Sequence, residues 1–301
     1  MRGSAVLLSL IAMTMASSVH QIVWSPYGTL IVWKTQAGLL GPKGWITGYR
    51  YYEPIKSAAY CCGTFAISFD EGTVELYNAT NLKEVGSFNA KFKVDFWPFN
   101  PTDSIAMIKV GKGERPIIVG YDALNGVIAA YNFQGERLWA VRADTDLFKT
   151  SKLIGHGDEV FYVDTVKGLV VVIDANGDLR QTYGYDDLQG ADVCGDVLAV
   201  KTSDRLLLYK LNGTEANEIL SIKVELMKIA PKATVKLSPL CDKVAVHYYD
   251  FVDGEGVRVY DLRGHVIADF GVDEVSAIGW LNETEVLIGT KTGTIYHGSV
   301  S

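Results

Sequence analysis

Histidine and cysteine, which build many catalytic and metal centres, are scarce in this sequence. Its 301 residues include five histidines and four cysteines. No two histidines have the His-x-x-x-His spacing of a helical metal site, and no Gly-x-Ser-x-Gly motif presents a serine nucleophile. The ligand spacings of a zinc site are missing as well. We therefore expect no catalytic residues, no metal and no cofactor, and we do not expect an enzyme.

Disulfide bonds are not expected either. Four cysteines in a chain of this length do not resemble the dense framework of a small secreted domain. Cys61 and Cys62 are adjacent and cannot readily bridge each other within a strand, while Cys194 and Cys241 stand alone. We expect four buried thiols that pack as small hydrophobic side chains.

A basic patch is also lacking. The formal net charge is -7, and the 28 Lys and Arg residues are scattered along the chain. Proteins that bind nucleic acid normally gather such residues into a patch or stripe, so we expect protein partners instead. The apolar run at residues 5–15 is too short to span a membrane, and we expect no membrane span.

No stretch of the sequence keeps a helical period, and short alternating runs of Val, Ile, Tyr and Phe fill the chain instead. Gly, Asp and Asn break these runs, which predicts an all-β protein of short strands and tight turns. One pattern recurs: a Gly, then Tyr or Ile five positions later, then another Gly four positions after that. It occurs at Gly126, Tyr131 and Gly135 and at Gly168, Ile173 and Gly177, with Asp in the first place at Asp204, Tyr209 and Gly213 and Asn in the last at Gly72, Tyr77 and Asn81.

Such a recurrence is the signature of a repeat architecture, and the last Gly of each unit fits a turn that needs positive φ. Asp and Asn also tolerate positive φ. A second pattern supports this interpretation. The end of the first strand in WD40-like repeats resembles the segment Trp24, Ser25, Pro26, Tyr27 and Gly28. Related endings occur at residues 96–98, 237–239 and 279–282.

These residues resemble a divergent WD40-like or YVTN-type β-propeller, without the Trp-Asp dipeptide. The resemblance implies one domain over residues 1–301, a seven-bladed β-propeller of four-stranded antiparallel blades. We name the four strands of a blade a, b, c and d in chain order. The predicted blades are residues 19–54, 56–89, 91–143, 150–184, 190–224, 233–270 and 273–301.

The last predicted blade has only three strands, so its strand d must come from elsewhere. Residues 4–11 have suitable length and apolarity, and pairing them with residues 294–300 would close the fold and remove exposed sheet edges. The alternative is that residues 1–16 are a secretory signal peptide. We favour the closing strand and a cytoplasmic protein; three glycosylation sequons, at Asn78, Asn212 and Asn282, mildly favour the secreted alternative.

Blade 3 also has two interpretations. The strand-like segment 116–121 lies between a plausible strand b at 104–110 and a strand c that begins near Gly126. Either it is a hairpin inserted between strands b and c, or the register is shifted there.

In a propeller the b–c and d–a connections lie at one end of each blade, and the a–b and c–d turns lie at the other. The longest predicted b–c links are residues 34–44, 111–125 and 249–256, and we expect the partner surface at that end. The candidate residues on it are Tyr248, Tyr249, Asp250, Phe251, Asp253, Glu255, Arg115, Lys112, Asp186 and Asp187. Tyrosine is favoured among interface anchors.

The sequence thus predicts a non-catalytic β-propeller scaffold for protein–protein interaction. Two alternatives remain open. One is a secreted or envelope-side propeller that binds a ligand or acts as an enzyme at its channel mouth, and the other is a structural subunit of a larger assembly.

Overall fold

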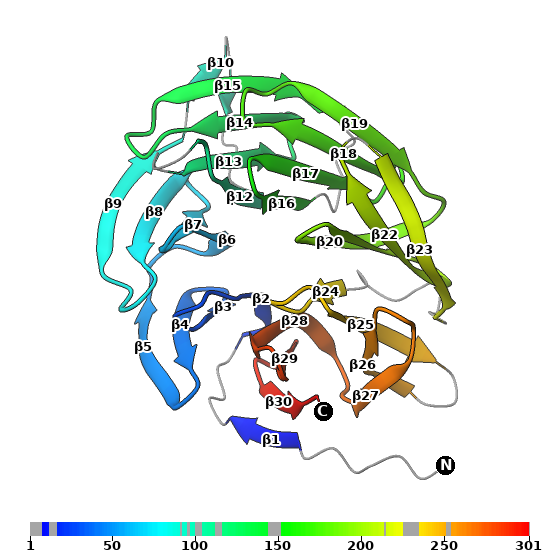
Figure 1. Ribbon diagram of the computed structural model, residues 1–301. Coiled ribbons are helices and arrows are strands. Elements are labelled where there is room, and N and C mark those ends of the chain that lie inside the picture. The colour runs from blue at the N-terminus through cyan, green and yellow to red at the C-terminus, as the bar shows by residue number, and fades with distance from the viewer. Residues whose placement is uncertain are drawn as a thin grey trace. The chain divides into compact units, whose positions relative to one another are not determined.

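The computed structural model describes residues 8–11, 17–90, 92–94, 97–99, 104–111, 116–143, 152–213, 215–224, 235–250 and 254–300. Every regular element within these residues is a β-strand. The strands form seven four-stranded antiparallel sheets, which are the predicted blades, and one short hairpin (Figure 1). The chain divides into two compact units, residues 1–24 with 187–301 and residues 25–186.

Blades 1 to 4 follow one another along the chain. Blade 1 contains β2 (Val19–Val23), β3 (Thr29–Trp33), β4 (Gln36–Gly41) and β5 (Gly44–Arg50). Blade 2 contains β6 (Ile55–Cys61), β7 (Thr64–Phe69), β8 (Thr73–Asn78) and β9 (Glu84–Asn89). After the hairpin of β10 (Phe92–Val94) and β11 (Trp97–Phe99), blade 3 contains β12 (Ser104–Ile108), β13 (Ile117–Asp122), β14 (Val127–Tyr131) and β15 (Arg137–Arg142). Blade 4 contains β16 (Lys152–His156), β17 (Glu159–Asp164), β18 (Leu169–Asp174) and β19 (Leu179–Gly184).

Blades 5 to 7 complete the chain. Blade 5 contains β20 (Leu188–Cys194), β21 (Val197–Thr202), β22 (Arg205–Asn212) and β23 (Glu215–Lys223). Blade 6 contains β24 (Val235–Leu237), β25 (Lys243–Asp250), β26 (Gly254–Asp261) and β27 (Val266–Gly271). Blade 7 contains β28 (Val275–Asn282), β29 (Glu285–Thr290), β30 (Ile295–Ser299) and β1 (Leu8–Ile11), in that order across the sheet.

Burial explains the two kinds of strand that the sequence contains. The b strands read as continuous apolar runs because both of their faces are covered: β3 and β13 are buried at every position. The d strands β15 and β19 instead alternate between exposed and half-buried residues, because one face meets solvent. The core therefore lies mainly on the a, b and c strands, and in blade 6 strand d adds Ala268 and Phe270.

The closing strand predicted for blade 7 is confirmed over its described part. β1 pairs antiparallel with β30, with Leu8 opposite Gly298 and Ile11 opposite Ile295 (Figure 1). The N-terminal strand therefore supplies the strand d that the C-terminal segment lacks. A cleavage after Ala16 would remove this strand.

The register of blade 3 follows the second of the two interpretations. β12 is strand a and β13 is strand b, since β12 pairs only with β13 in a sheet ordered β12-β13-β14-β15. The expected strand b at 104–110 and the expected strand a ending at 96–98 are therefore wrong, and β11 belongs to the separate hairpin. β12 and β13 are therefore successive strands a and b of this blade.

The lengths predicted for the b–c links are also wrong. In blade 1 the expected link 34–44 contains strand β4, so that only Lys34 and Thr35 connect β3 to β4. In blade 6 the expected link 249–256 is mostly strand, with Tyr249 paired to Glu255 and Asp250 paired to Gly254. The apolar positions of β4 are small or lie next to glycines, which hides a strand from pattern recognition.

The turn glycines behave as the repeat requires. Gly135, Gly177, Gly213 and Gly264 all have positive φ. The first glycine of the unit has a second role: its carbonyl accepts a backbone hydrogen bond from the residue that follows strand d, as Tyr185 N does to Gly168 O at 2.7 Å. Of the two substitute residues, neither Asp204 nor Asn81 has positive φ, and in blade 2 Leu82 takes that conformation at 53°.

Deleting residues 1–11 should destabilise the protein, because β30 becomes an unpaired edge. We expect the unfolding midpoint to fall by roughly 2–4 °C for each kcal/mol lost, and the truncated protein to associate through the exposed strand. Thermal unfolding and size-exclusion chromatography measure both. A truncated protein that stays monomeric with an unchanged midpoint would contradict the pairing.

A pair of glycine variants separates backbone strain from crowding. Gly168 and Gly213 have similar φ values, 67° and 61°, but a Cβ on Gly168 would lie 2.1 Å from Tyr185 O, whereas a Cβ on Gly213 has no heavy atom within 4 Å. Both Ala variants carry the left-handed strain of about 1 kcal/mol. We expect Gly168→Ala to cost at least about 1 kcal/mol more than Gly213→Ala in denaturant unfolding. Equal costs would show that the Gly168 contact is relaxed in solution.

Candidate functional site

The predicted anchor Tyr248 is a core residue. Its side chain is 3% exposed, and its hydroxyl donates a 2.8 Å hydrogen bond to Asp269 Oδ1. The guanidinium of Arg258 lies 4.3 Å from the centre of the Tyr248 ring and also binds Asp269, with Nε 2.7 Å from Oδ2. Tyr248 therefore holds strands β25, β26 and β27 together and is not available to a partner.

Glu255 is likewise a structural residue. Its Oε2 accepts a hydrogen bond from Glu274 N at 2.8 Å, and its Oε1 accepts one from Val275 N at 3.0 Å. His247 Nε2 lies 2.8 Å from Oε1 and donates to it, because a carboxylate can only accept. Burial lowers the pKa of His247, although the Glu255 carboxylate opposes this effect. This carboxylate thus joins the start of β26 to the start of β28.

Of the described aromatic candidates, Tyr249 remains exposed. It lies near the end of β25, its side chain is 36% exposed, and it is paired across the ladder with Glu255. β25 and β26 are eight residues long, longer than the b and c strands of blades 1 to 4. Tyr249 therefore lies on an extended hairpin, between the two anchored residues Tyr248 and Glu255.

Three of the remaining candidates lie within the described residues: Asp186, Asp187 and Asp250. Asp186 and Asp187 are exposed in the link between β19 and β20, where Asp187 Oδ2 accepts a 3.3 Å hydrogen bond from Ser203 Oγ. Asp250 closes β25, and Phe251, Asp253, Lys112 and Arg115 lie outside the described residues.

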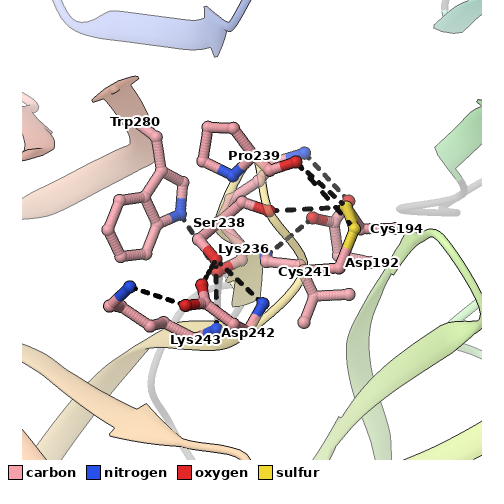
Figure 2. Close-up of a disulfide and its surroundings, with 10 residues drawn as sticks. Asp192, Cys194, Lys236, Ser238, Pro239, Cys241, Asp242, Lys243 and Trp280 are labelled. Atoms are coloured by element: carbon pink, nitrogen blue, oxygen red, sulfur yellow. Dashed lines mark hydrogen bonds and ion pairs between the residues drawn. A yellow bond between two sulfur atoms is a disulfide. The ribbon is translucent and has the colours of Figure 1, made fainter. Parts of the chain in front are cut away.

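The four cysteines form two disulfide bonds. Cys194, at the end of β20, forms a disulfide with Cys241, in the turn between β24 and β25 (Figure 2). Their Cα atoms are 5.3 Å apart, within the usual range for such a bond. The sulfur atoms of Cys61 and Cys62 are also joined. The expectation of free thiols is therefore wrong, and Cys194–Cys241 ties blade 5 to blade 6.

A salt bridge runs beside this disulfide. Asp192, which is 5% exposed, accepts hydrogen bonds of 2.9 Å from Lys236 Nζ and from Leu237 N (Figure 2). Leu237 belongs to strand a of blade 6, so Asp192 connects the a strands of two neighbouring blades. The charge of Asp192 is therefore buried and paired.

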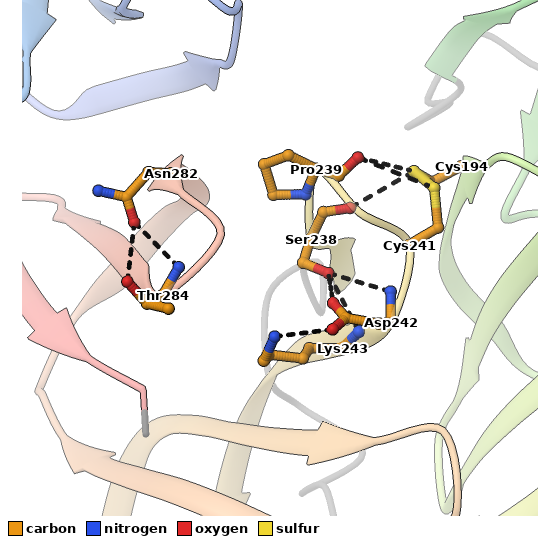
Figure 3. Close-up of polar contacts among 8 residues, drawn as sticks. All are labelled: Cys194, Ser238, Pro239, Cys241, Asp242, Lys243, Asn282 and Thr284. Carbon is orange, nitrogen blue, oxygen red and sulfur yellow. Dashed lines mark hydrogen bonds and ion pairs between the residues drawn. A yellow bond between two sulfur atoms is a disulfide. The ribbon is translucent and has the colours of Figure 1, made fainter.

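Side chains also fix the turns after the a strands, at the positions that resemble WD40 repeats. Ser238 Oγ accepts from the backbone N–H groups of Asp242 and Lys243 at 3.2 and 3.0 Å (Figure 3). In blade 7, Asn282 Oδ1 accepts from Thr284 N at 2.9 Å and from Thr284 Oγ1 at 3.2 Å (Figure 3). The recurring Ser or Asn thus closes the a–b turn in place of a backbone partner.

The amino group of Lys201 is buried and donates hydrogen bonds to backbone carbonyl oxygens. Lys201, in β21, has no exposed surface, and its Nζ donates to the carbonyl oxygens of Thr202 and Val224, the second at 3.4 Å. Burial lowers the pKa of Lys201 to about 8, although the nearby Asp204 carboxylate opposes this effect. Folding therefore disfavours the charged ammonium form relative to the unfolded chain.

Within the described residues, no group of three or more His, Cys, Asp and Glu side chains could hold a metal ion. In the same residues there is no helix long and apolar enough to cross a membrane.

Comparison with solved structures settles the fold class. The chain superimposes on the β-propeller domain of Cps50 (Swd1) from Myceliophteria thermophila with a TM-score of 0.70, over 98% of this chain and 100% of that one. The chain has the fold of a WD40-type β-propeller. Sequence identity is 12%, so the likeness of this propeller to Swd1 shows the fold alone. No family model and no curated protein matches the sequence.

Breaking the Cys194–Cys241 disulfide of the propeller should lower its stability, because the bond closes a loop with a sequence separation of 47. We expect a loss of about 2–4 kcal/mol in denaturant unfolding on reduction or in a Cys194→Ser/Cys241→Ser variant. The variant is the control, since reductant should change its midpoint much less than that of the wild type. Equal shifts in both proteins, or no shift in the wild type, would contradict a stabilising bond.

Replacing Lys201 by Met should change how stability depends on pH. Because the folded pKa of Lys201, about 8, is below its ordinary value, folding opposes the charge. The wild type therefore gains stability as pH rises from 8 to about 10.5, by on the order of 3 kcal/mol.

The Lys201→Met protein should lack this gain and be relatively more stable below pH 8. Urea unfolding at several pH values measures the difference, with the exposed Lys210→Met as a control that keeps the gain. A Lys201→Met profile parallel to that of the wild type would show that Lys201 remains charged in the fold.

Proposed function

We propose that this propeller is a non-catalytic scaffold that binds a protein partner, with Tyr249 as an anchor at the b–c end of blade 6. The observation that carries the proposal is a half-exposed tyrosine on a hairpin whose neighbouring residues are fixed. Tyr248 is held by Asp269 and Arg258, and Glu255 is held by the backbone of blade 7.

A surface of this kind costs little entropy to bind, because its backbone is already ordered before the partner arrives. Tyr249 offers a large, stiff side chain with a polar end, as hot-spot residues typically do. The long b–c links that first suggested this end of the blades do not support the proposal, since each of the three predicted ranges contains strand residues. The propeller fold supports a scaffold, and the hairpin gives the scaffold an anchor.

The cellular location is also a proposal. The pairing of β1 with β30 favours a protein that keeps residues 1–16 and remains in the cytoplasm. The Cys194–Cys241 bond favours an oxidising compartment or the cytosol of a hyperthermophile, where disulfides are common. The N-terminal sequence of the native protein distinguishes a retained from a cleaved segment.

Affinity capture from the source cells tests the anchor. We expect Tyr249→Ala to weaken capture of a specific partner by tenfold or more, since truncating a hot spot typically costs about 2 kcal/mol. Tyr27→Ala is the matched control, because Tyr27 is 49% exposed but lies in an a–b turn. A partner that is retained by Tyr249→Ala and lost with Tyr27→Ala would place binding at the other end of the blades.

A further inference from the structure

Blades 3 and 4 each have a b–c turn of the same kind, and each turn exposes an apolar side chain to solvent. In blade 3, Asp122 Oδ1 accepts hydrogen bonds from Leu124 N at 2.8 Å and from Asn125 N at 3.0 Å. In blade 4, Asp164 Oδ1 accepts from Val166 N at 3.1 Å and from Lys167 N at 3.0 Å. Both aspartates are 2% exposed, whereas Leu124 is 68% and Val166 55% exposed. Two neighbouring b–c turns thus hold apolar residues outward.

A groove of about 290 Å³ lies between the same two blades. Its walls are apolar and come from β14 and β15 on one side and from β17, β18 and β19 on the other; they include Ile128, Val141, Tyr162, Leu169, Val171 and Ile173. Ala143 also lines it, and Ala143 N donates a 2.7 Å hydrogen bond to Gly126 O. The groove therefore runs up to the turn that carries Leu124.

Three charged residues line the groove: Arg142, Lys167 and Asp164. Arg142 and Lys167 are exposed, whereas the Asp164 carboxylate is buried and accepts hydrogen bonds from the backbone of its own turn. Arg142 has no ion-pair partner among the described residues of blades 3 and 4. In a protein with a net charge of -7, a cationic, apolar groove is complementary to an anionic, apolar ligand.

We propose that this groove binds a short acidic segment of a partner protein. An apolar side chain of the segment enters between β15 and β18, and a flanking carboxylate faces Arg142 and Lys167. Leu124 and Val166 extend the apolar contact beyond the groove, which suits a peptide chain better than a compact small molecule. This inference rests on the proposed scaffold function but uses blades 3 and 4, not the Tyr249 hairpin.

The test titrates the full-length protein, with labelled Ile, Leu and Val methyl groups, against two synthetic peptides followed by NMR. The acidic probe is N-acetyl-Asp-Glu-Leu-Phe-Asp-Glu-amide, and the basic probe has Lys and Arg in place of the acidic residues. We expect only the acidic peptide to shift the methyl signals of Leu169 and Val171. Shifts elsewhere, shifts from both peptides alike, or no shifts at millimolar peptide would overturn the proposal.

Charge variants sharpen the result. Arg142→Glu should weaken the acidic peptide at least tenfold, and Arg142→Glu with Lys167→Glu should gain binding to the basic peptide. Arg137→Glu is the matched control, since Arg137 is exposed on the same strand but does not line the groove. Unchanged affinity in Arg142→Glu, with a normal melting curve, would also overturn the proposal.

The two surfaces can fail separately. Loss of peptide binding with an intact effect of Tyr249→Ala on partner capture would reject only the groove. Peptide binding in the groove with no effect of Tyr249→Ala would reject only the anchor assigned to blade 6.

Discussion

The a strands create the constraint on which this structure depends. Each a strand lies at the edge of its sheet, so the N–H groups on its unpaired side have no partner in the ladder. Buried N–H groups without a partner are costly. Polar side chains of the preceding blade satisfy them: Leu153 N donates to Ser104 Oγ at 3.0 Å, and Leu237 N donates to Asp192 Oδ2 at 2.9 Å. Ser57 Oγ likewise accepts a hydrogen bond from Ile105 N at 3.2 Å. In these three connections one short polar residue joins one blade to the next.

Much of the fold could be predicted because it depends on local patterns. Apolar b strands, turn glycines and the missing strand of the last blade all leave a signature in the sequence, and β1 was placed from length and apolarity alone. The register of blade 3 could not be placed, because β12 and β13 are both buried apolar strands and only pairing distinguishes strand a from strand b. The β10–β11 hairpin also contains strand-like residues, and it belongs to none of the seven blades.

The site was less predictable, because it depends on contacts between distant residues. Nothing in the spacing of Cys194 and Cys241 indicates that two blades bring them to a Cα distance of 5.3 Å. Tyr248 and Tyr249 look alike in sequence, but alternation along β25 buries the first and exposes the second. A usable signal was missed at the end of the c strands: Asp174 and Asp261 follow Ile173 and Tyr260 and cap the next turn through Oδ1, where WD40 repeats have the Asp of their dipeptide.

Amide hydrogen exchange tests most directly whether these side chains join the blades. We expect the N–H groups of Leu153 and Leu237 to exchange as slowly as their ladder-bonded neighbours, although neither has a strand partner on that edge. We also expect Ser104→Ala to speed exchange at Leu153 and to leave Leu237 protected. Exchange of both amides at the rate of an open chain in the wild type would show that these side chains do not join the blades.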